Sequence, residues 1–198
     1  YWNSTVTNTF GYRKIKSIEI MNLSNDGSNV DGNKIILNCD CLAISGGWTP
    51  MVHMHTQSGG KLNFREDDQV FVPKEQSTDK ISVGSCNGDL ELDDVIQNTN
   101  IQIKNFLNIK ESDYENINVN CSKELDKRNI WLLPNHLPLG KTKSYIDFQN
   151  DSTAKDIKLA LQEGFRSIEH VKRYTTTGMA TDQGKLSNMH ALGIVAET

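Results

Sequence analysis

The chain has 198 residues, a formal net charge of −4 at pH 7 and 36% hydrophobic residues, which fits one or two folded domains rather than a disordered chain. No apolar run approaches the roughly 18 residues of a membrane span, and the acidic balance argues against a nucleic-acid surface. Four cysteines in a chain of this length do not make a disulfide framework. We therefore expect a soluble cytoplasmic protein that binds neither membranes nor nucleic acid.

Both ends of the sequence suggest a piece of a longer polypeptide. The chain begins with Tyr1-Trp2 rather than with Met, and it stops just after the apolar run Gly193–Ala196. We therefore expect an internal fragment.

The first 38 residues predict a small β meander. Residues that favour strands, in part alternating with polar neighbours, predict two strands within 4–23 and a third over Lys34–Asn38. The polar run 24–29 between the second and third strands has the chemistry of a turn.

Two short apolar runs predict strands that are buried on both faces of a parallel sheet. Cys41–Ile44 leads into a Ser-Gly-Gly-Trp turn, and Lys80–Val83 leads into the glycine-bearing stretch 84–89, after which residues 92–107 have a helical period. A strand, a turn and a helix in this order can cradle a phosphate, because a helix N-terminus offers free N–H groups. The GxGxxG fingerprint of dinucleotide sites is absent.

Residues 39–108 are thus expected to form the C-terminal part of an α/β, FAD/NAD-binding type of domain. The expected cofactor-binding residues lie in its two turns: Ser45, Gly46, Gly47, Trp48, Gly84, Ser85, Cys86, Gly88 and Asp89.

The rest of the chain divides into a linker and a small helical domain. Residues 109–143 are polar and irregular, as in a linker. From residue 144, Thr153 and Asp156 form the pattern of a capping box, and Gly164 suits the position that follows a helix. We expect one helix there, a second after Ser167 and a third within 188–196.

The potential metal ligands do not form a complete site. Cys39-x-Cys41 lacks the second pair that zinc requires, so we expect buried, apolar cysteines. His53-x-His55 places two imidazoles on one side of a strand without a third ligand, and we interpret them as ordinary polar strand residues. No nucleophile motif is present, and no catalytic residue is expected.

Residues 145–185 closely resemble the alpha subunit of heterotetrameric sarcosine oxidase. The resemblance rests on Tyr145–Asp151, Glu163–Thr176 and Gly178–Lys185, and Ala43–Pro50 with Gln57–Lys61 resemble an upstream part of the same subunit. It implies that residues 1–38 end an inserted nucleotide-binding subdomain of a disulfide-reductase-like fold. Residues 39–108 would return to the first such domain, and residues 144–198 would link it to a folate-binding domain outside this chain.

The resemblance also implies an activity, cofactors and partners. The family oxidises sarcosine to glycine and hydrogen peroxide and passes the one-carbon unit to tetrahydrofolate. NAD would bind the alpha subunit, FAD the beta subunit and FMN the boundary between these two subunits, and the gamma and delta subunits would complete the complex. This chain would contribute part of the NAD site and contacts to other subunits, and Gly178 and Met179 could approach the flavin.

The helical domain also resembles the [2Fe–2S] module of bacterioferritin-associated ferredoxin, but it lacks the cysteines of that module. The positions of those cysteines correspond here to Asp147–Asn150, to Asp182 and to the neighbourhood of Leu186–Asn188, and no cysteine follows Cys121. A cluster needs four thiolates, so none is expected. The alternatives are a subunit of an amine or opine dehydrogenase that does carry a cluster, and a non-catalytic assembly segment.

Overall fold

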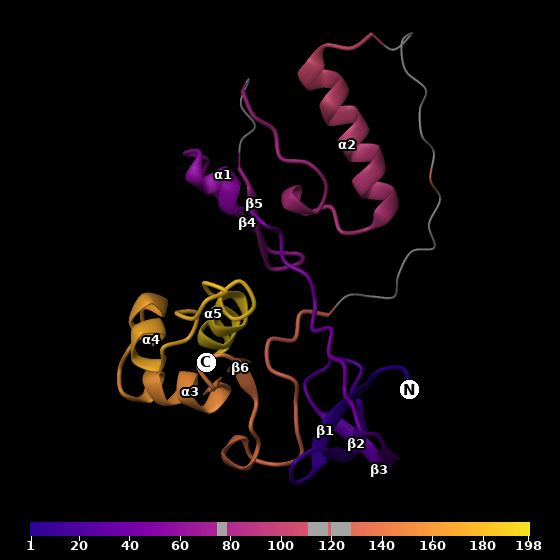
Figure 1. Cartoon of the computed structure of the whole chain (residues 1–198), viewed down its shortest axis with the longest axis vertical. Helices are drawn as coiled ribbons and strands as arrows, with labels where there is room; N and C mark the ends of the chain where they lie inside the picture. The colour runs from indigo at the N-terminus through magenta and orange to yellow at the C-terminus, as the bar shows by residue number, and fades with distance from the viewer. Residues whose placement is uncertain (75–78, 111–118, 120–127) are drawn as a thin grey trace. The chain divides into compact units, whose positions relative to one another are not determined.

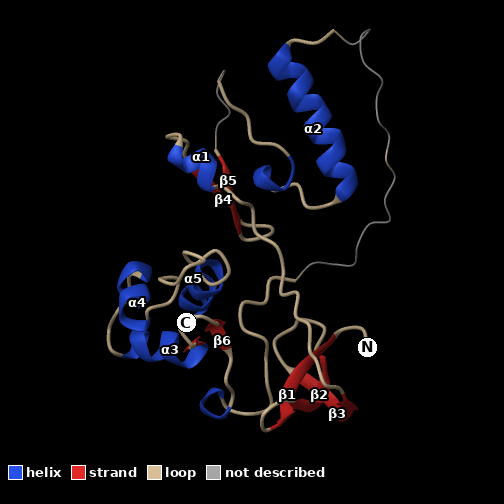
Figure 2. Cartoon of the chain, viewed as in Figure 1, coloured by secondary structure: helices blue, strands red, loops and turns tan. Residues whose placement is uncertain are grey.

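A computed structural model describes residues 1–74, 79–110, 119 and 128–198. They form two units, one of residues 1–44 and 130–198 and the other of residues 45–129 (Figure 1). Helices and strands occur in both units (Figure 2), which confirms the α/β class in its broad sense. None of the described helices is long and apolar enough to cross a membrane.

The first unit begins with the predicted meander. Its antiparallel strands are β1 (Ser4–Gly11), β2 (Ile15–Leu23) and β3 (Val30–Asn38), with β2 in the centre. Val6 pairs with Ile20, and bulges interrupt the register on both sides of the central strand. The meander is therefore confirmed, and its third strand begins four residues earlier than expected.

The first unit ends in a cluster of three helices. A short hairpin of β6 (Tyr145–Asp147) and β7 (Ser152–Thr153) leads into α3 (Ala154–Gln162), which is followed by α4 (Ile168–Thr175) and α5 (Asn188–Glu197). Thr153 and Asp156 form the predicted capping box at the start of α3. The helices bury a small apolar core, made of Ile146, Ala154, Ile157, Ala160, Val171, Ala191 and Ile194.

The segment before this cluster packs against α5 at a glycine. A Cβ atom on Gly193 would lie 2.2 Å from the indole ring of Trp131, and the ring of His190 meets that indole edge-on at 5.8 Å. Only glycine leaves room for this contact. A short 3-10 helix, η3 (Leu139–Lys141), then leads toward the hairpin.

The second unit contains a hairpin and a long helix. Its elements are α1 (His53–Gln57), the antiparallel pair β4 (Leu62–Arg65) and β5 (Val70–Pro73), the 3-10 helix η1 (Gly84–Asn87) and α2 (Leu92–Leu107). The rings of Phe64 and Phe71 meet across the hairpin at 5.2 Å. The helix predicted over 92–107 is confirmed, but none of its residues is buried, and Ile101 and Leu107 are among its exposed apolar side chains.

The two parallel strands were predicted wrongly. Cys41–Ile44 and Lys80–Val83 lie outside the strands, and every sheet among the described residues is antiparallel. Val83 has extended dihedral angles, with φ −133° and ψ 161°. A strand also needs a neighbour to complete its hydrogen bonds, and the described residues offer these two runs no partner.

The predicted environments of the histidines and cysteines are also corrected. His53 and His55 lie on α1, where residues two apart face different directions, and only His55 is buried. Cys41 and Cys86 are exposed and Cys39 is half-buried. Cys41 is exposed because the run that contains it does not form a buried strand. Cys121 lies outside the described residues, as do residues 111–118 and 120–127 of the predicted linker.

Candidate functional site

The predicted glycine-bearing turn is a compact structure in the second unit. Gly84 opens the 3-10 helix η1 with φ +63°, and Gly88 closes it with φ +86°. The backbone N–H of Gly88 donates to Ser85 and that of Asp89 donates to Gly84, both at 3.2 Å. Ser85 and Cys86 are exposed at the top of the turn.

An arginine of the neighbouring hairpin fixes this turn. The guanidinium of Arg65 donates two hydrogen bonds to the Asp68 carboxylate, one of them from Nε at 2.8 Å, and Nη2 also donates to the Gly88 carbonyl at 2.8 Å. Hydrogen bonding to Asp68 raises the pKa of Arg65, although burial opposes it. A Cβ atom on Gly88 would lie 2.7 Å from Val72 Cγ1 and 2.8 Å from Arg65 Nη2. The glycine is therefore required by both its backbone angle and its neighbours.

Asp89, which follows the turn, uses its two carboxylate oxygens differently. Its Oδ1 accepts a hydrogen bond from Asn98 Nδ2 on α2 at 3.0 Å, whereas Oδ2 is buried and has no hydrogen-bond partner among the described residues. A buried polar atom without a partner is costly and is usually satisfied by a further group. A carboxylate oxygen accepts hydrogen bonds, so the group that suits it is a donor such as a sugar hydroxyl.

The start of α2 does not suit a phosphate. Glu91 caps the helix and Asp93 and Asp94 lie in its first turn. These carboxylates oppose the positive potential of the helix N-terminus. The Asp89 oxygen thus suits a hydrogen-bond donor, whereas the phosphate cradle expected from the sequence is electrostatically unfavourable here.

The second predicted segment, Ser45–Trp48, is an exposed stretch without helix or strand. The Trp48 side chain is 79% exposed, and Gly47 has φ +125°. Both predicted segments belong to the second unit, but no hydrogen bond joins them among the described residues.

In the helical cluster, a buried carboxylate stands at one of the expected cysteine positions. Asp147 accepts hydrogen bonds from the backbone N–H groups of Gly178, Gln149 and Asn150 at 2.8, 2.9 and 3.0 Å. Burial raises the pKa of Asp147, and the hydrogen bonds from these three N–H groups outweigh it, so the pKa lies below its usual value. In the described part of the chain, no three His, Cys, Asp or Glu side chains gather as ligands for a metal ion.

Sequence reasoning missed three residues of the candidate site: Arg65, Asp68 and Asn98. Arg65 and Asp68 are three residues apart with a turn between them, which is a common surface pattern. Asn98 faces Asp89 only because α2 folds back beside the turn. No motif in the sequence would have identified these three residues.

Comparisons with known proteins agree with the resemblance. Residues 141–198 match the family described as the sarcosine oxidase A3 domain. The chain is 29% identical over 205 residues to sarcosine oxidase subunit alpha of Rhizobium meliloti (strain 1021), which covers 98% of this chain and 19% of that protein. It is 31% identical over 169 residues to sarcosine oxidase subunit alpha of Corynebacterium sp. (strain U-96), which covers 79% of this chain and 17% of that protein.

A solved structure has a similar fold. The L-proline dehydrogenase from P. horikoshii superposes with a TM-score of 0.54 over 98% of this chain and 38% of its own, at 18% identity. The chain spans less than a fifth of the length of the relatives named above. The resemblance found in the sequence is thus confirmed, and this chain is a relative of the sarcosine oxidase alpha subunits.

Proposed function

We propose that this chain acts as part of a sarcosine oxidase alpha subunit. The complete enzyme would oxidise sarcosine to glycine with release of hydrogen peroxide, and it would pass the one-carbon unit to tetrahydrofolate. The observation that carries the proposal is the match to a sarcosine oxidase alpha subunit over 98% of the chain. The name of that relative also supports a complex of several subunits, for which we propose beta, gamma and delta partners in the cytoplasm.

Within this complex, the second unit would contribute to an NAD site. FAD and FMN would carry the oxidation, and tetrahydrofolate would bind a domain outside this chain. The buried Asp89 Oδ2, for which the described part of the chain offers no hydrogen-bond partner, supports a contact with a ribose hydroxyl of NAD. Arg65 would hold the turn in place through the Gly88 carbonyl.

The helical cluster would serve as a scaffold related to the ferredoxin module, without its iron–sulfur cluster. The hydrogen bonds of Asp147 support this role. At one of the expected cysteine positions, its carboxylate accepts hydrogen bonds from three backbone N–H groups and so acts as a structural group. It would link the nucleotide-binding part to the rest of the subunit.

The NAD proposal is tested by a pair of matched variants in the assembled enzyme. Asp89→Asn keeps an acceptor for Asn98 but replaces Oδ2 by an amide N–H group. We expect the dissociation constant for NAD, measured by calorimetry, to rise about tenfold to a hundredfold, as for a lost hydrogen bond to a charged group. Asp94→Asn removes a nearby exposed carboxylate and should leave the constant within about twofold. Equal constants for wild type and Asp89→Asn would contradict the assignment.

A second candidate is a dehydrogenase subunit that passes electrons to an acceptor other than oxygen. This candidate rests on the fold shared with an L-proline dehydrogenase. Iron analysis and oxygen consumption of the purified complex distinguish the two. Stoichiometric iron, together with amine oxidation that requires an added dye, would support the dehydrogenase. An iron-free complex that reduces oxygen would support the oxidase.

A further inference from the structure

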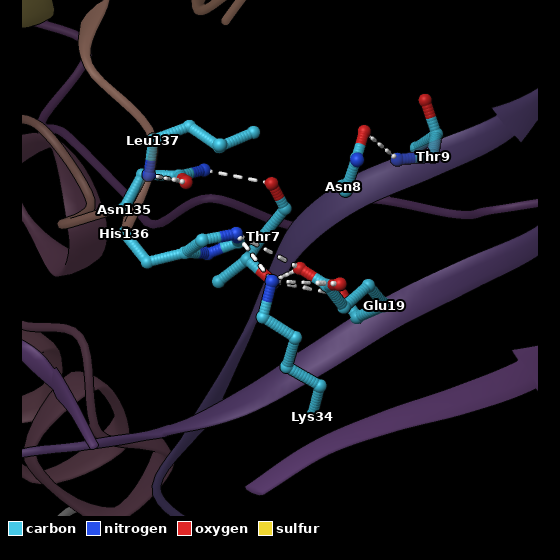
Figure 3. A network of polar contacts seen from close by, with 8 residues as sticks. All are labelled: Thr7, Asn8, Thr9, Glu19, Lys34, Asn135, His136 and Leu137. Carbon is cyan, nitrogen blue, oxygen red and sulfur yellow. Dashed lines mark hydrogen bonds and ion pairs between the residues drawn. The ribbon is translucent and has the colours of Figure 1, made fainter. Parts of the chain in front are cut away.

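A buried carboxylate on the central strand of the meander gathers three side chains (Figure 3). The side chain of Glu19 on β2 is only 6% exposed. Its Oε1 accepts a hydrogen bond from Thr7 Oγ1 on β1 at 2.8 Å. Lys34 Nζ on β3 lies 3.5 Å from Oε2, and His136 Nε2 lies 3.6 Å from Oε1. Among the described residues, Glu19 and Lys34 are the charged groups in contact with this imidazole, and the neighbouring strand β1 contributes the uncharged Thr7.

The shortest contact in this network joins Lys34 and His136 and suits one tautomer of the histidine. Lys34 Nζ and His136 Nε2 are 2.7 Å apart. A lysine ammonium has three donors and no acceptor, so Nε2 must accept and must carry no proton. A charged Lys34 thus suits the His136 tautomer that carries its proton on Nδ1.

A second proton on the imidazole would reverse this contact. Nε2–H would face the Lys34 ammonium, and two cations at that distance repel each other. Glu19 Oε1 is the acceptor within reach, since a movement of less than 1 Å would shorten 3.6 Å to a hydrogen bond. The Lys34 side chain is 49% exposed and can turn toward water as the imidazole moves.

The same histidine lies in a segment that is attached to the meander. Asn135 Nδ2 donates to the Thr7 carbonyl at 2.7 Å, and the Leu137 N–H donates to Asn135 Oδ1 at 2.9 Å. The contacts of His136 with Lys34 and Glu19 therefore also hold residues 135–137 against β1 and β2.

We propose that His136 attaches segment 135–137 to the meander both when its imidazole is neutral and when it is protonated. Neutral His136 accepts from Lys34, and protonated His136 donates to Glu19. Glu19 thereby makes the attachment resistant to acid, and Lys34 sets the tautomer at neutral pH. This role is independent of any cofactor.

The first test is the tautomer of His136, read from the ¹⁵N resonances of its ring in the full 198-residue chain. The resonances are assigned with a His136→Gln variant, since the chain has five histidines. At pH 8 we expect an unprotonated Nε2. Lys34→Met should transfer the proton to Nε2, which then donates to Glu19, whereas Lys16→Met, an exposed change on β2, should leave the tautomer unchanged. A protonated Nε2 at pH 8 in the wild type, or a tautomer that ignores Lys34→Met, would overturn the proposal.

The second test is the exchange of the Asn135 side-chain amide protons at pH 8 and pH 5.5, corrected for intrinsic rates. In the wild type, protection should stay within about twofold, because one hydrogen bond replaces another. In Glu19→Gln, which retains an acceptor for Thr7, protection should fall about tenfold in acid only, since protonated His136 then has no carboxylate to bind. A similar fall in protection in the wild type would show that the Glu19 carboxylate does not bind the protonated His136. The tautomer measurement on the wild type stands even if Glu19→Gln fails to fold.

Discussion

The Asp147 carboxylate accepts a hydrogen bond from the backbone N–H of Gly178, 31 residues further along the chain, at 2.8 Å. The bond joins the turn after β6 to the turn after α4. Asn150 Nδ2 reinforces the same junction by donating to the Thr176 carbonyl at 2.8 Å. Two turns that are distant in sequence are thus held together around one buried charge.

Asp147→Asn should destabilise the helical cluster. The amide would keep one acceptor oxygen, but its N–H group would face the Gly178 N–H, and two donors cannot bond. We expect the free energy of unfolding to fall by about 1–3 kcal/mol, as for a buried group left without its partner. Chemical denaturation followed by circular dichroism measures this change. Asp151→Asn makes the same change at an exposed neighbour and should have little effect, so equal losses in both variants would contradict the role of Asp147.

The same carboxylate should make stability sensitive to acid. Burial raises the pKa of Asp147, but the hydrogen bonds from its three N–H donors lower it by more, so the folded-state pKa lies below the unfolded value of about 3.9. The stabilisation is therefore present above that pH and is lost as the pH falls through the folded-state pKa. Below pH 4, wild type should lose stability more steeply than Asp147→Asn. Parallel curves for the two proteins between pH 5 and pH 2 would refute this.

The sequence predicted the elements whose signals are local. The capping box of Thr153 and Asp156 marked the start of α3, and alternation marked β2, because each pattern acts within a few residues. The runs 41–44 and 80–83 failed, because an apolar strand forms only beside a partner and the described residues offer none. The hairpin of β4 and β5 was missed, since its polar turn resembles a loop.

The candidate site was predictable only in part, for a similar reason. Glycines at 84 and 88 indicated a tight turn, and both have positive φ there. Arg65 reaches that turn from a hairpin 23 residues earlier, a contact that depends on the tertiary fold. The charges of Asp93 and Asp94 were readable in the sequence, and they argue against the phosphate cradle that the glycines suggested.

Gly193→Ala should weaken the attachment of Trp131 to α5. A Cβ atom there would lie 2.2 Å from the indole, so the ring must move. Overpacking of this kind costs about 1–3 kcal/mol. In a background with Trp2→Phe and Trp48→Phe, the Trp131 fluorescence should shift to the red as its ring becomes more exposed. Gly140→Ala, at a glycine with open space around it, is the control and should leave the emission unchanged. An unshifted spectrum in Gly193→Ala would argue against the contact.

Gly88→Ala should disturb the candidate turn. Alanine is strained at φ +86° and its Cβ would press on Val72 and Arg65. We expect a loss of about 2–3 kcal/mol in the free energy of unfolding of the second unit, measured by hydrogen exchange of α2 amides. Protection of α2 that matches the wild type would show that the turn tolerates a side chain.

We propose that this chain belongs to an enzyme that oxidises sarcosine with molecular oxygen. The most direct measurement is oxygen consumption by the complex assembled around this chain, with sarcosine as substrate and with glycine and hydrogen peroxide quantified. The account predicts that each mole of oxygen consumed yields one mole of glycine and one mole of peroxide. Sarcosine oxidation that proceeds only with an added dye, or no turnover of sarcosine at all, would contradict it.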